Sequence, residues 1–330
     1  MNSNPVVVAE ANHIEKLIRI GSRASELALR SARLVESLLV AAGASCEIVI
    51  IKSAGDKKRK DLAHLVGEVG LFTRELEVAL AKGKVDCCVH ALRDLPTEGA
   101  DGLEIVACLE RDDPRDVLVV NPVTQADSLE SLPAGSRVGT SSPARRAQLL
   151  ARRRDLQVVE LRGDVPTRLR KVERGQVHAT IFSASDLIRL NATQRITTWF
   201  NAPAWLPVAG QGATAIQIRS DDDAMRNLLA RHDHAPTSIA TRAERAFVAA
   251  LDSSGTAPIG ALVQADMNLL GFVSDANGGT IVRGSRRVDP SLPEDSGEAL
   301  ASELRERGAG SLLAELRSAE RAKASVRGES

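Results

Sequence analysis

Aromatic residues are scarce in this sequence, which contains five Phe, two Trp and no Tyr among 330 residues. Proteins that bind single-stranded nucleic acid without sequence preference stack its bases on aromatic rings, so the composition disfavours this class. The sequence also lacks an excess of either charge, because Lys plus Arg and Asp plus Glu number 43 each. No bulk electrostatic field therefore attracts nucleic acid or a membrane surface. We expect neither as a partner.

Cysteine is scarce as well, and the spacing of the four cysteines matches no metal site. All four lie in apolar, strand-like contexts, which is typical of reduced core thiols: Cys46, Cys87, Cys88 and Cys108. No apolar run is long enough to span a membrane, and the N-terminus lacks the apolar core of a signal peptide. Neither a glycine-rich phosphate loop nor a Ser-His-Asp set is present. We therefore expect a cytoplasmic protein without a bound metal.

Apolar residues make up 43% of the chain, which is long enough to bury the cores of two or three domains. Strand and helix patterns alternate over residues 17–90, and a second unit of similar size covers about 113–183. This alternation predicts parallel sheets with helices on both faces. A flexible segment at 208–212 is expected to return the chain to the first unit, since 215–219 has the pattern of a strand. Two lobes joined in this way place a ligand cleft between them.

A third unit begins near residue 235, and its predicted elements are a helix at 238–250, strands at 261–266, 268–274 and 279–286, and a helix at 294–308. The sequence therefore predicts an α/β protein with several parts. These are a flexible extension at 1–15, a first domain at 16–111 and 209–231, a second at 112–208, a third at 235–317 and a disordered tail at 318–330.

A guanidinium and a carboxylate stand side by side after the apolar strand at 85–90, in Arg93 and Asp94. Loops that leave strand ends carry chemistry more often than the strands themselves. A carboxylate there can stabilise positive charge on a substrate N–H, and the arginine can hold an acid group. An isolated Arg-Asp pair before a proline is usually a surface ion pair. A functional role for this pair is favoured because we expect other loops to bring arginines close to it.

Three other strand-end loops supply arginines, namely Arg23, Arg145 and the pair Arg162 and Arg168. Arg145 falls in the first turn of a helix that Ser142 is expected to cap, where a cation opposes the helix dipole. An anion bound at that N-terminus would reverse the sign of this effect. Because the planar guanidinium matches carboxylates, we predict a polyanionic ligand rich in carboxylates, although phosphate fits as well.

These loops resemble those of the hydroxymethylbilane synthase, or porphobilinogen deaminase, family. The matching stretches are 18–29, 70–77, 89–96, 113–116, 132–136, 139–142, 161–169, 210–213, 243–246 and 258–260. Together they span about residues 18–310, and the set in this order is highly specific. The resemblance implies two periplasmic-binding-protein-like lobes of type II with a cleft between them, and a small α/β C-terminal domain.

The family joins four porphobilinogen units head to tail and releases ammonia at each step, and its substrate carries acetate and propionate groups. By position, Asp94 resembles the carboxylate that stabilises the pyrrole N–H groups as charge develops. The residues that match the family's substrate side are Arg23, Ser25, Arg93, Arg162, Arg168 and Arg189. Arg93 stands where the family usually has lysine. Ser142 and Arg145 match groups that hold the dipyrromethane cofactor.

The chain departs from the family where this cofactor is attached. The family carries it as a thioether on a cysteine shortly before Pro-Ile-Gly, and Gly255 occupies that position. Glycine has no nucleophile, and the neighbouring hydroxyls lack an obvious activating base, so we expect no covalent attachment. Ala144 replaces the first of two arginines, and Ala54, Leu65 and Val69 replace one arginine and two lysines. The lost groups mostly hold the primer, whereas those for one pyrrole are kept.

We therefore predict a monomeric enzyme that deaminates and condenses porphobilinogen or a related carboxylated aminomethylpyrrole, with a dipyrromethane-like primer bound only non-covalently. The alternative is a non-catalytic protein that binds a carboxylated pyrrole or another small polyanion in the cleft, because the fold permits both. Nucleic-acid binding is a third hypothesis, since residues 137–174 contain eleven Lys or Arg against four Asp or Glu. The neutral total charge and the missing aromatics oppose it.

Overall fold

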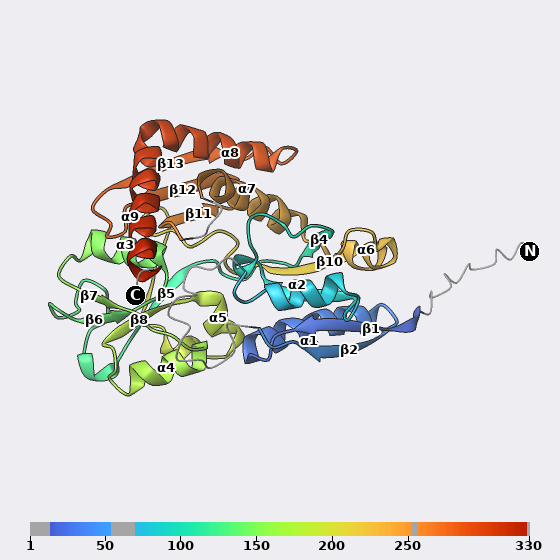
Figure 1. Cartoon of the computed structure of the whole chain (residues 1–330). Coiled ribbons are helices and arrows are strands. Elements are labelled where there is room, and N and C mark those ends of the chain that lie inside the picture. Colours follow the sequence, from blue (N-terminus) through green and yellow to red (C-terminus); the bar gives the residue numbers. More distant parts are fainter. Residues whose placement is uncertain (1–13, 54–69, 253–255, 329–330) are drawn as a thin grey trace, which may run out of the picture.

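The computed structural model describes residues 14–53, 70–252 and 256–328, and these form three lobes that are each built on one β-sheet (Figure 1). Four positions singled out in the sequence lie outside the described residues, as does most of the predicted N-terminal extension: Ala54, Leu65, Val69 and Gly255. Within the described ranges, no helix combines the length and the apolar character needed to cross a membrane.

The first lobe has a five-stranded sheet in the order β2-β1-β3-β10-β4. Its elements are β1 (Ile14–Ser22), α1 (Glu26–Ala41), β2 (Ala44–Ile50), α2 (Arg74–Ala81), β3 (Cys87–Ala91), β4 (Leu103–Cys108), β10 (Thr214–Arg219) and α6 (Asp223–Leu229). As the alternating pattern predicted, β1 pairs in parallel with β2 and β3, whereas β10 runs antiparallel between β3 and β4. Ile20, Val89 and Ile216 of the sheet pack against Val35 and Leu39 of α1 in the core.

The second lobe repeats this arrangement in the order β7-β6-β8-β5-β9. Its elements are β5 (Asp116–Val120), β6 (Arg137–Gly139), α3 (Pro143–Arg152), β7 (Gln157–Val159), α4 (Val165–Glu173), β8 (Ala179–Ser183), α5 (Ala184–Arg189) and β9 (Thr198–Trp199). Here β5 is the antiparallel strand. Each lobe thus receives one antiparallel strand from a segment that crosses from the other lobe. This is the type II periplasmic-binding-protein topology that the sequence predicted, and the boundaries between the domains stay predictions.

The third lobe is an antiparallel sheet of three strands with helices packed against it. Its elements are α7 (Ala235–Leu251), β11 (Ile259–Val263), β12 (Asn268–Ser274), β13 (Ile281–Arg287), α8 (Pro293–Leu304) and α9 (Gly310–Gly328). The ring of Phe247 lies against Gly271, where a Cβ atom would stand 2.5 Å from the ring. The glycine therefore allows α7 to approach the sheet closely.

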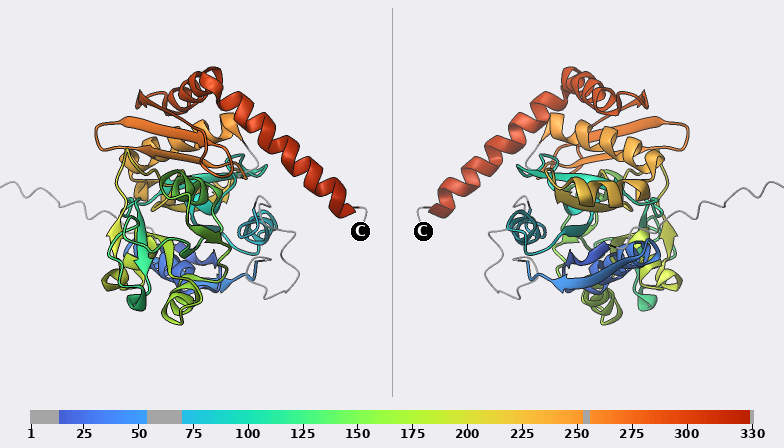
Figure 2. Two further views of the ribbon diagram at one scale, coloured as in Figure 1. Left: turned by 90° about the vertical axis from the view of Figure 1, so that its left-hand side faces the viewer. Right: turned by 90° about the vertical axis from the view of Figure 1, so that its right-hand side faces the viewer.

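The prediction of a disordered tail at 318–330 is wrong for most of that segment, because α9 continues to Gly328 and projects from the third lobe (Figure 2). Leu313 is buried in the core of this lobe and Leu316 packs against it. Arg317 donates a hydrogen bond of 3.0 Å to the carbonyl oxygen of Leu251. These contacts hold the first half of α9 against the third lobe. The helix is rich in Ala, Arg and Glu, which favour helix formation.

A buried carboxylate joins the third lobe to the segments that cross between the first two. Glu244 of α7 is fully buried and accepts two hydrogen bonds from Arg111, at 2.6 and 3.0 Å. The main-chain N–H groups of Gly210 and Val263 also donate to it, each at 2.8 Å. A buried carboxylate needs such partners, because burial without them is costly in free energy. The three lobes are therefore fixed to one another at the crossing.

Candidate active site

Asp94 lies on a single 3₁₀ turn, Leu92–Asp94, directly after the buried strand β3. Its carboxylate is 28% exposed and stands 3.7 Å from Nη1 of Arg23 and 3.8 Å from Nε of Arg93. The loop after β1 therefore brings Arg23 to the Arg-Asp pair, as the sequence predicted. The result is a partly exposed carboxylate between two guanidinium groups.

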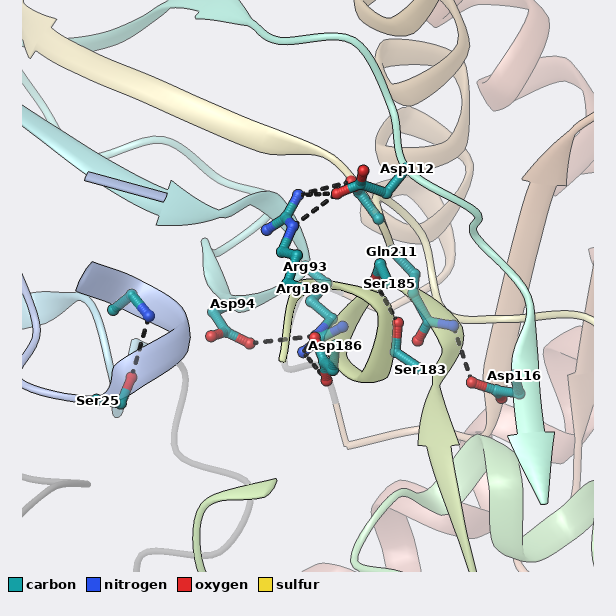
Figure 3. A network of polar contacts seen from close by, with 12 residues as sticks. Ser25, Arg93, Asp94, Asp112, Asp116, Ser183, Ser185, Asp186, Arg189 and Gln211 are labelled. Atoms are coloured by element: carbon teal, nitrogen blue, oxygen red, sulfur yellow. Dashed lines mark hydrogen bonds and ion pairs between the residues drawn. The ribbon is translucent and has the colours of Figure 1, made fainter. Parts of the chain in front are cut away.

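Arg93 extends from this turn to the second lobe, where Nη2 donates to both carboxylate oxygens of Asp186 at 2.9 and 2.8 Å (Figure 3). The side chain of Asp186 is only 9% exposed. Burial alone would lower the pKa of the Arg93 guanidinium, but the carboxylates of Asp186 and Asp94 raise this pKa above its ordinary value. The sequence did not reveal Asp186, but its place three residues after the end of the buried strand β8 was a signal of the same kind as for Asp94, which lies three residues after the end of β3.

Arg23 and Ser25 are held by contacts within the first lobe. The guanidinium carbon of Arg23 lies 4.2 Å from the ring centroid of Phe72, which favours its charge through a cation–π interaction. Ser25 caps α1, because its hydroxyl accepts a hydrogen bond of 3.3 Å from the N–H of Ala28. Ser25 therefore fixes the start of the helix that follows the Arg23 loop. Phe72 was not recognised from the sequence as a site residue.

Arg168, another of the arginines predicted to bind substrate, has a hydrogen-bond donor that the protein leaves unused. Its Nε is buried and has no hydrogen-bond partner among the described residues. The guanidinium carbon lies 4.9 Å from the ring centroid of Phe182. Burial, together with the charge of Arg145, lowers the pKa of Arg168 to about 10. A cation with a buried and unused N–H is a ready partner for an anionic ligand.

Arg145 is engaged with the protein itself. Its Nε and Nη2 donate to the two carboxylate oxygens of Asp116 at 3.1 and 2.7 Å, and Nη2 also reaches Oε1 of Gln211 at 3.1 Å. Asp116 is buried and accepts further hydrogen bonds from Trp205 and Gln211. These contacts give Arg145 a structural task at the crossing, and its predicted role in holding a dipyrromethane stays a prediction.

Ser142 and Ala144 lie at the start of the same helix. Ser142 caps α3 by accepting a hydrogen bond of 3.3 Å from the N–H of Arg145. Ala144 is buried in an apolar cluster that joins the second lobe to the third, with Leu206, Leu262, Leu270 and Phe272. The position where the family has an arginine is therefore part of an apolar contact between lobes.

Arg189 and Arg162 each pair with a carboxylate of their own. Nε of Arg189 donates to Asp112 at 2.6 Å, and its other nitrogens reach Ser31 and the carbonyl oxygen of Gly212, both at 3.2 Å. Arg162 donates to Glu160 at 2.7 Å, and both side chains are largely exposed. The structure thus brings Arg23, Arg93 and Asp94 together, and Arg168 lies near enough to Arg93 for the charge of Arg93 to act on its pKa. The substrate-binding roles of Arg189 and Arg162 stay predictions.

Known proteins resemble this chain over almost its whole length. The family model for "Porphobilinogen deaminase, dipyromethane cofactor binding domain" matches residues 18–227. A porphobilinogen deaminase of Moorella thermoacetica is 42% identical over 305 residues, which cover 91% of this chain and 96% of the relative. A porphobilinogen deaminase of Xanthomonas campestris pv. campestris is 40% identical over 304 residues, or 91% and 99% of the two chains. Among solved structures, the periplasmic VFT2 domain of Bordetella pertussis BvgS matches 66% of this chain and 86% of its own, with a TM-score of 0.42 and 14% identity.

Proposed function

The chain belongs to the porphobilinogen deaminase family and is a transferase of that type, and we propose that it acts without a covalently attached dipyrromethane. The proposed reaction is the deamination and condensation of porphobilinogen or a closely related carboxylated aminomethylpyrrole. The group formed by Asp94, Arg23 and Arg168 carries this proposal. Because two lobes of one chain supply these residues, we further propose that the protein acts as a monomer.

Asp94 is proposed to hold the pyrrole N–H during the reaction. When the bond between the aminomethyl carbon and its nitrogen breaks, ammonia leaves and positive charge spreads into the pyrrole ring. A carboxylate that accepts a hydrogen bond from the ring N–H stabilises that charge as it develops. The α-carbon of a second pyrrole then forms the new C–C bond and releases its proton. The partial exposure of Asp94 leaves its oxygens within reach of such a ligand.

Arg168 supports the choice of a carboxylated ligand. Its Nε is a buried donor with no acceptor among the described residues, and such a donor is costly in free energy. A ligand carboxylate would supply the missing acceptor through a charge-assisted hydrogen bond. The open donor lies close enough to Arg93 and Asp186 for their charges to act on its pKa. An acid group at Arg168 would therefore place the ligand near Arg93 of the first lobe and Asp186 of the second.

A dipyrromethane is the group that the matching family model leads us to expect, since that model is named for its binding. The described residues fit its acid groups in part, because Arg168 has an open N–H whereas Arg145 is engaged with Asp116. Ala144 supplies no cation, and Gly255 supplies no thiol for a thioether. We therefore propose that this chain holds any dipyrromethane without a covalent bond, with Arg168 as the residue that binds one of its carboxylates.

Intact mass, measured before and after incubation with porphobilinogen, tests the proposed function. We expect a mass equal to the bare chain at both times, with ammonia released and only free pyrrole products formed. An added mass of two or more pyrroles would contradict the proposal and show a covalent tether. Peptide mapping of the segment at 253–256 would then locate that tether.

The alternative function is non-catalytic binding of a carboxylated pyrrole or another small polyanion, and Gly255 is the observation that favours it. A binding protein would be stabilised against heat by porphobilinogen and would release no ammonia. An Asp94→Ala variant would then be stabilised to the same extent as the original protein. Unequal stabilisation, together with release of ammonia by the original protein, would exclude this alternative.

A further inference from the structure

The contact between Arg93 and Asp186 places a carboxylate of the second lobe on a guanidinium that lies beside Asp94 of the first lobe. Arg93 comes from the first lobe and Asp186 from the second, and Nη2 of Arg93 lies 2.9 and 2.8 Å from the two oxygens (Figure 3). Both side chains are largely buried. The pair is therefore poorly screened by water, and an external carboxylate must compete with Asp186 for Arg93.

Arg168 is in the opposite situation within the same group of charges. The charges of Asp186 and Arg93 both act on it, yet its buried Nε has no acceptor among the described residues. Its guanidinium rests on the ring of Phe182. Arg93 is thus satisfied by the protein, whereas Arg168 retains an open donor for a ligand.

We propose that Asp186 is a specificity-determining residue that reduces by one the number of substrate carboxylates the cleft can bind. This inference rests on the proposed function and specifies its substrate class. The favoured substrate is an aminomethylpyrrole whose carboxylate reaches Arg168 and whose other ring substituent, next to Arg93, is uncharged. A second carboxylate on the ring would meet Asp186 as a like charge or would have to displace it from Arg93.

The test compares two pyrroles and three variants. The pyrroles are porphobilinogen, which has two carboxylates, and its analogue with a methyl group in place of the acetate. Asp186→Asn keeps the shape of the side chain and removes its charge, and Asp186→Ala is the second variant. Glu130→Gln is the matched control, because Glu130 lies on the same lobe, has a side chain that is 69% exposed, and undergoes the same change in charge. Dissociation constants are measured by calorimetry, and ammonia release is recorded in parallel.

The original protein is expected to bind the mono-acid at least as tightly as the di-acid. Both Asp186 variants should bind the di-acid about tenfold more tightly, as expected for one released charge-assisted contact, with the mono-acid changed by less than about twofold. Glu130→Gln should change neither. Equal gains for both pyrroles, or the same gain in Glu130→Gln, would overturn the proposal, as would no gain in either Asp186 variant.

The two readouts separate this inference from the proposed function. Binding with the expected preference but without ammonia release would uphold the role of Asp186 and overturn the proposed enzyme. If both pyrroles release ammonia but the Asp186 variants do not change their relative affinities, the proposed enzyme is upheld and the role of Asp186 is overturned. If neither pyrrole binds to the original protein or to any variant, both proposals fail.

Discussion

Nη1 of Arg245 donates a hydrogen bond of 3.0 Å to the carbonyl oxygen of Leu95, the residue that follows Asp94. The same guanidinium donates to the carbonyl oxygens of Leu92, Pro96 and Thr97. Arg245 belongs to α7 of the third lobe, so this lobe holds the turn that carries the candidate catalytic carboxylate. Burial lowers the pKa of Arg245. Its position next to Glu244 means that two successive residues of α7 fix the turn and the crossing.

Replacing Arg245 with Met should therefore change the position of Asp94, although Arg245 contacts the backbone of the turn and not the Asp94 side chain. We expect kcat to fall by at least about tenfold, because a misplaced carboxylate loses its contribution to the transition state. Hydrogen exchange of the amides at 92–97 should become faster, and Arg245→Lys should restore part of both properties. Arg242→Met is the control, since Arg242 lies on the same helix but pairs with the exposed Glu294. Unchanged kcat in Arg245→Met would contradict this positioning role.

Asp94→Asn should leave binding nearly intact and remove most of the chemistry. The amide keeps the size of the side chain but cannot stabilise a developing positive charge as a carboxylate does. We expect the rate of ammonia release to fall by about 10²–10³-fold, with the dissociation constant changed by less than about fivefold. Asp101→Asn removes one negative charge from an exposed position of the same lobe and should keep full activity. A fall in activity of the same size in both variants would show a general effect of charge.

Arg168→Met should weaken ligand binding and at the same time leave the fold as stable or more stable. Nε of the half-buried Arg168 is a buried donor without an acceptor among the described residues, so removing it relieves an unfavourable burial. With ligand, the loss of a charge-assisted contact should cost about 2 kcal/mol, or about thirtyfold in affinity. Calorimetry and urea unfolding measure the two effects. Arg170→Met, an exposed position of the same helix, should change neither.

His90 should make the fold sensitive to acid. It is 5% exposed within β3, and burial, opposed by Gln217 and reinforced by the charge of Arg23, lowers its pKa to about 4. The unfolded chain, with an ordinary pKa near 6.5, binds the proton more readily between these values. Stability is therefore fully present above about pH 6.5 and is lost as pH falls towards 4, by up to about 3 kcal/mol.

Urea unfolding at pH 7.5 and pH 4.5 measures this loss in the original protein and in His90→Gln. Carboxylates also contribute to acid sensitivity, so the difference between the two proteins isolates the imidazole. The variant should lose less stability than the original protein over this interval. An equal loss in both would show that His90 titrates in the fold as it does in the unfolded chain.

Local features of the chain were predictable because they depend on neighbours in the sequence. The sequence pattern identified the strand at 268–274, and the observed β12 has the same bounds. The cap Ser142 was recognised from the residues that follow it. Asp94 was singled out because it follows a buried strand and adjoins an arginine. In α9, by contrast, a polar composition concealed a helix whose first half is held by contacts with the third lobe.

The sequence by itself determined that the chain has two α/β lobes, a third unit and an excess of arginines in strand-end loops. Only the tertiary structure decided which of those arginines are free. Arg93 is paired because Asp186, 93 residues later, lies on the second lobe, and Arg145 is paired because Asp116 lies within hydrogen-bonding distance of it. Arg168 has the same chemistry as both and retains an open donor. The physical reason is that a guanidinium pairs with the carboxylate that lies nearest to it in space. The pattern of strands and helices in the sequence does not give these distances.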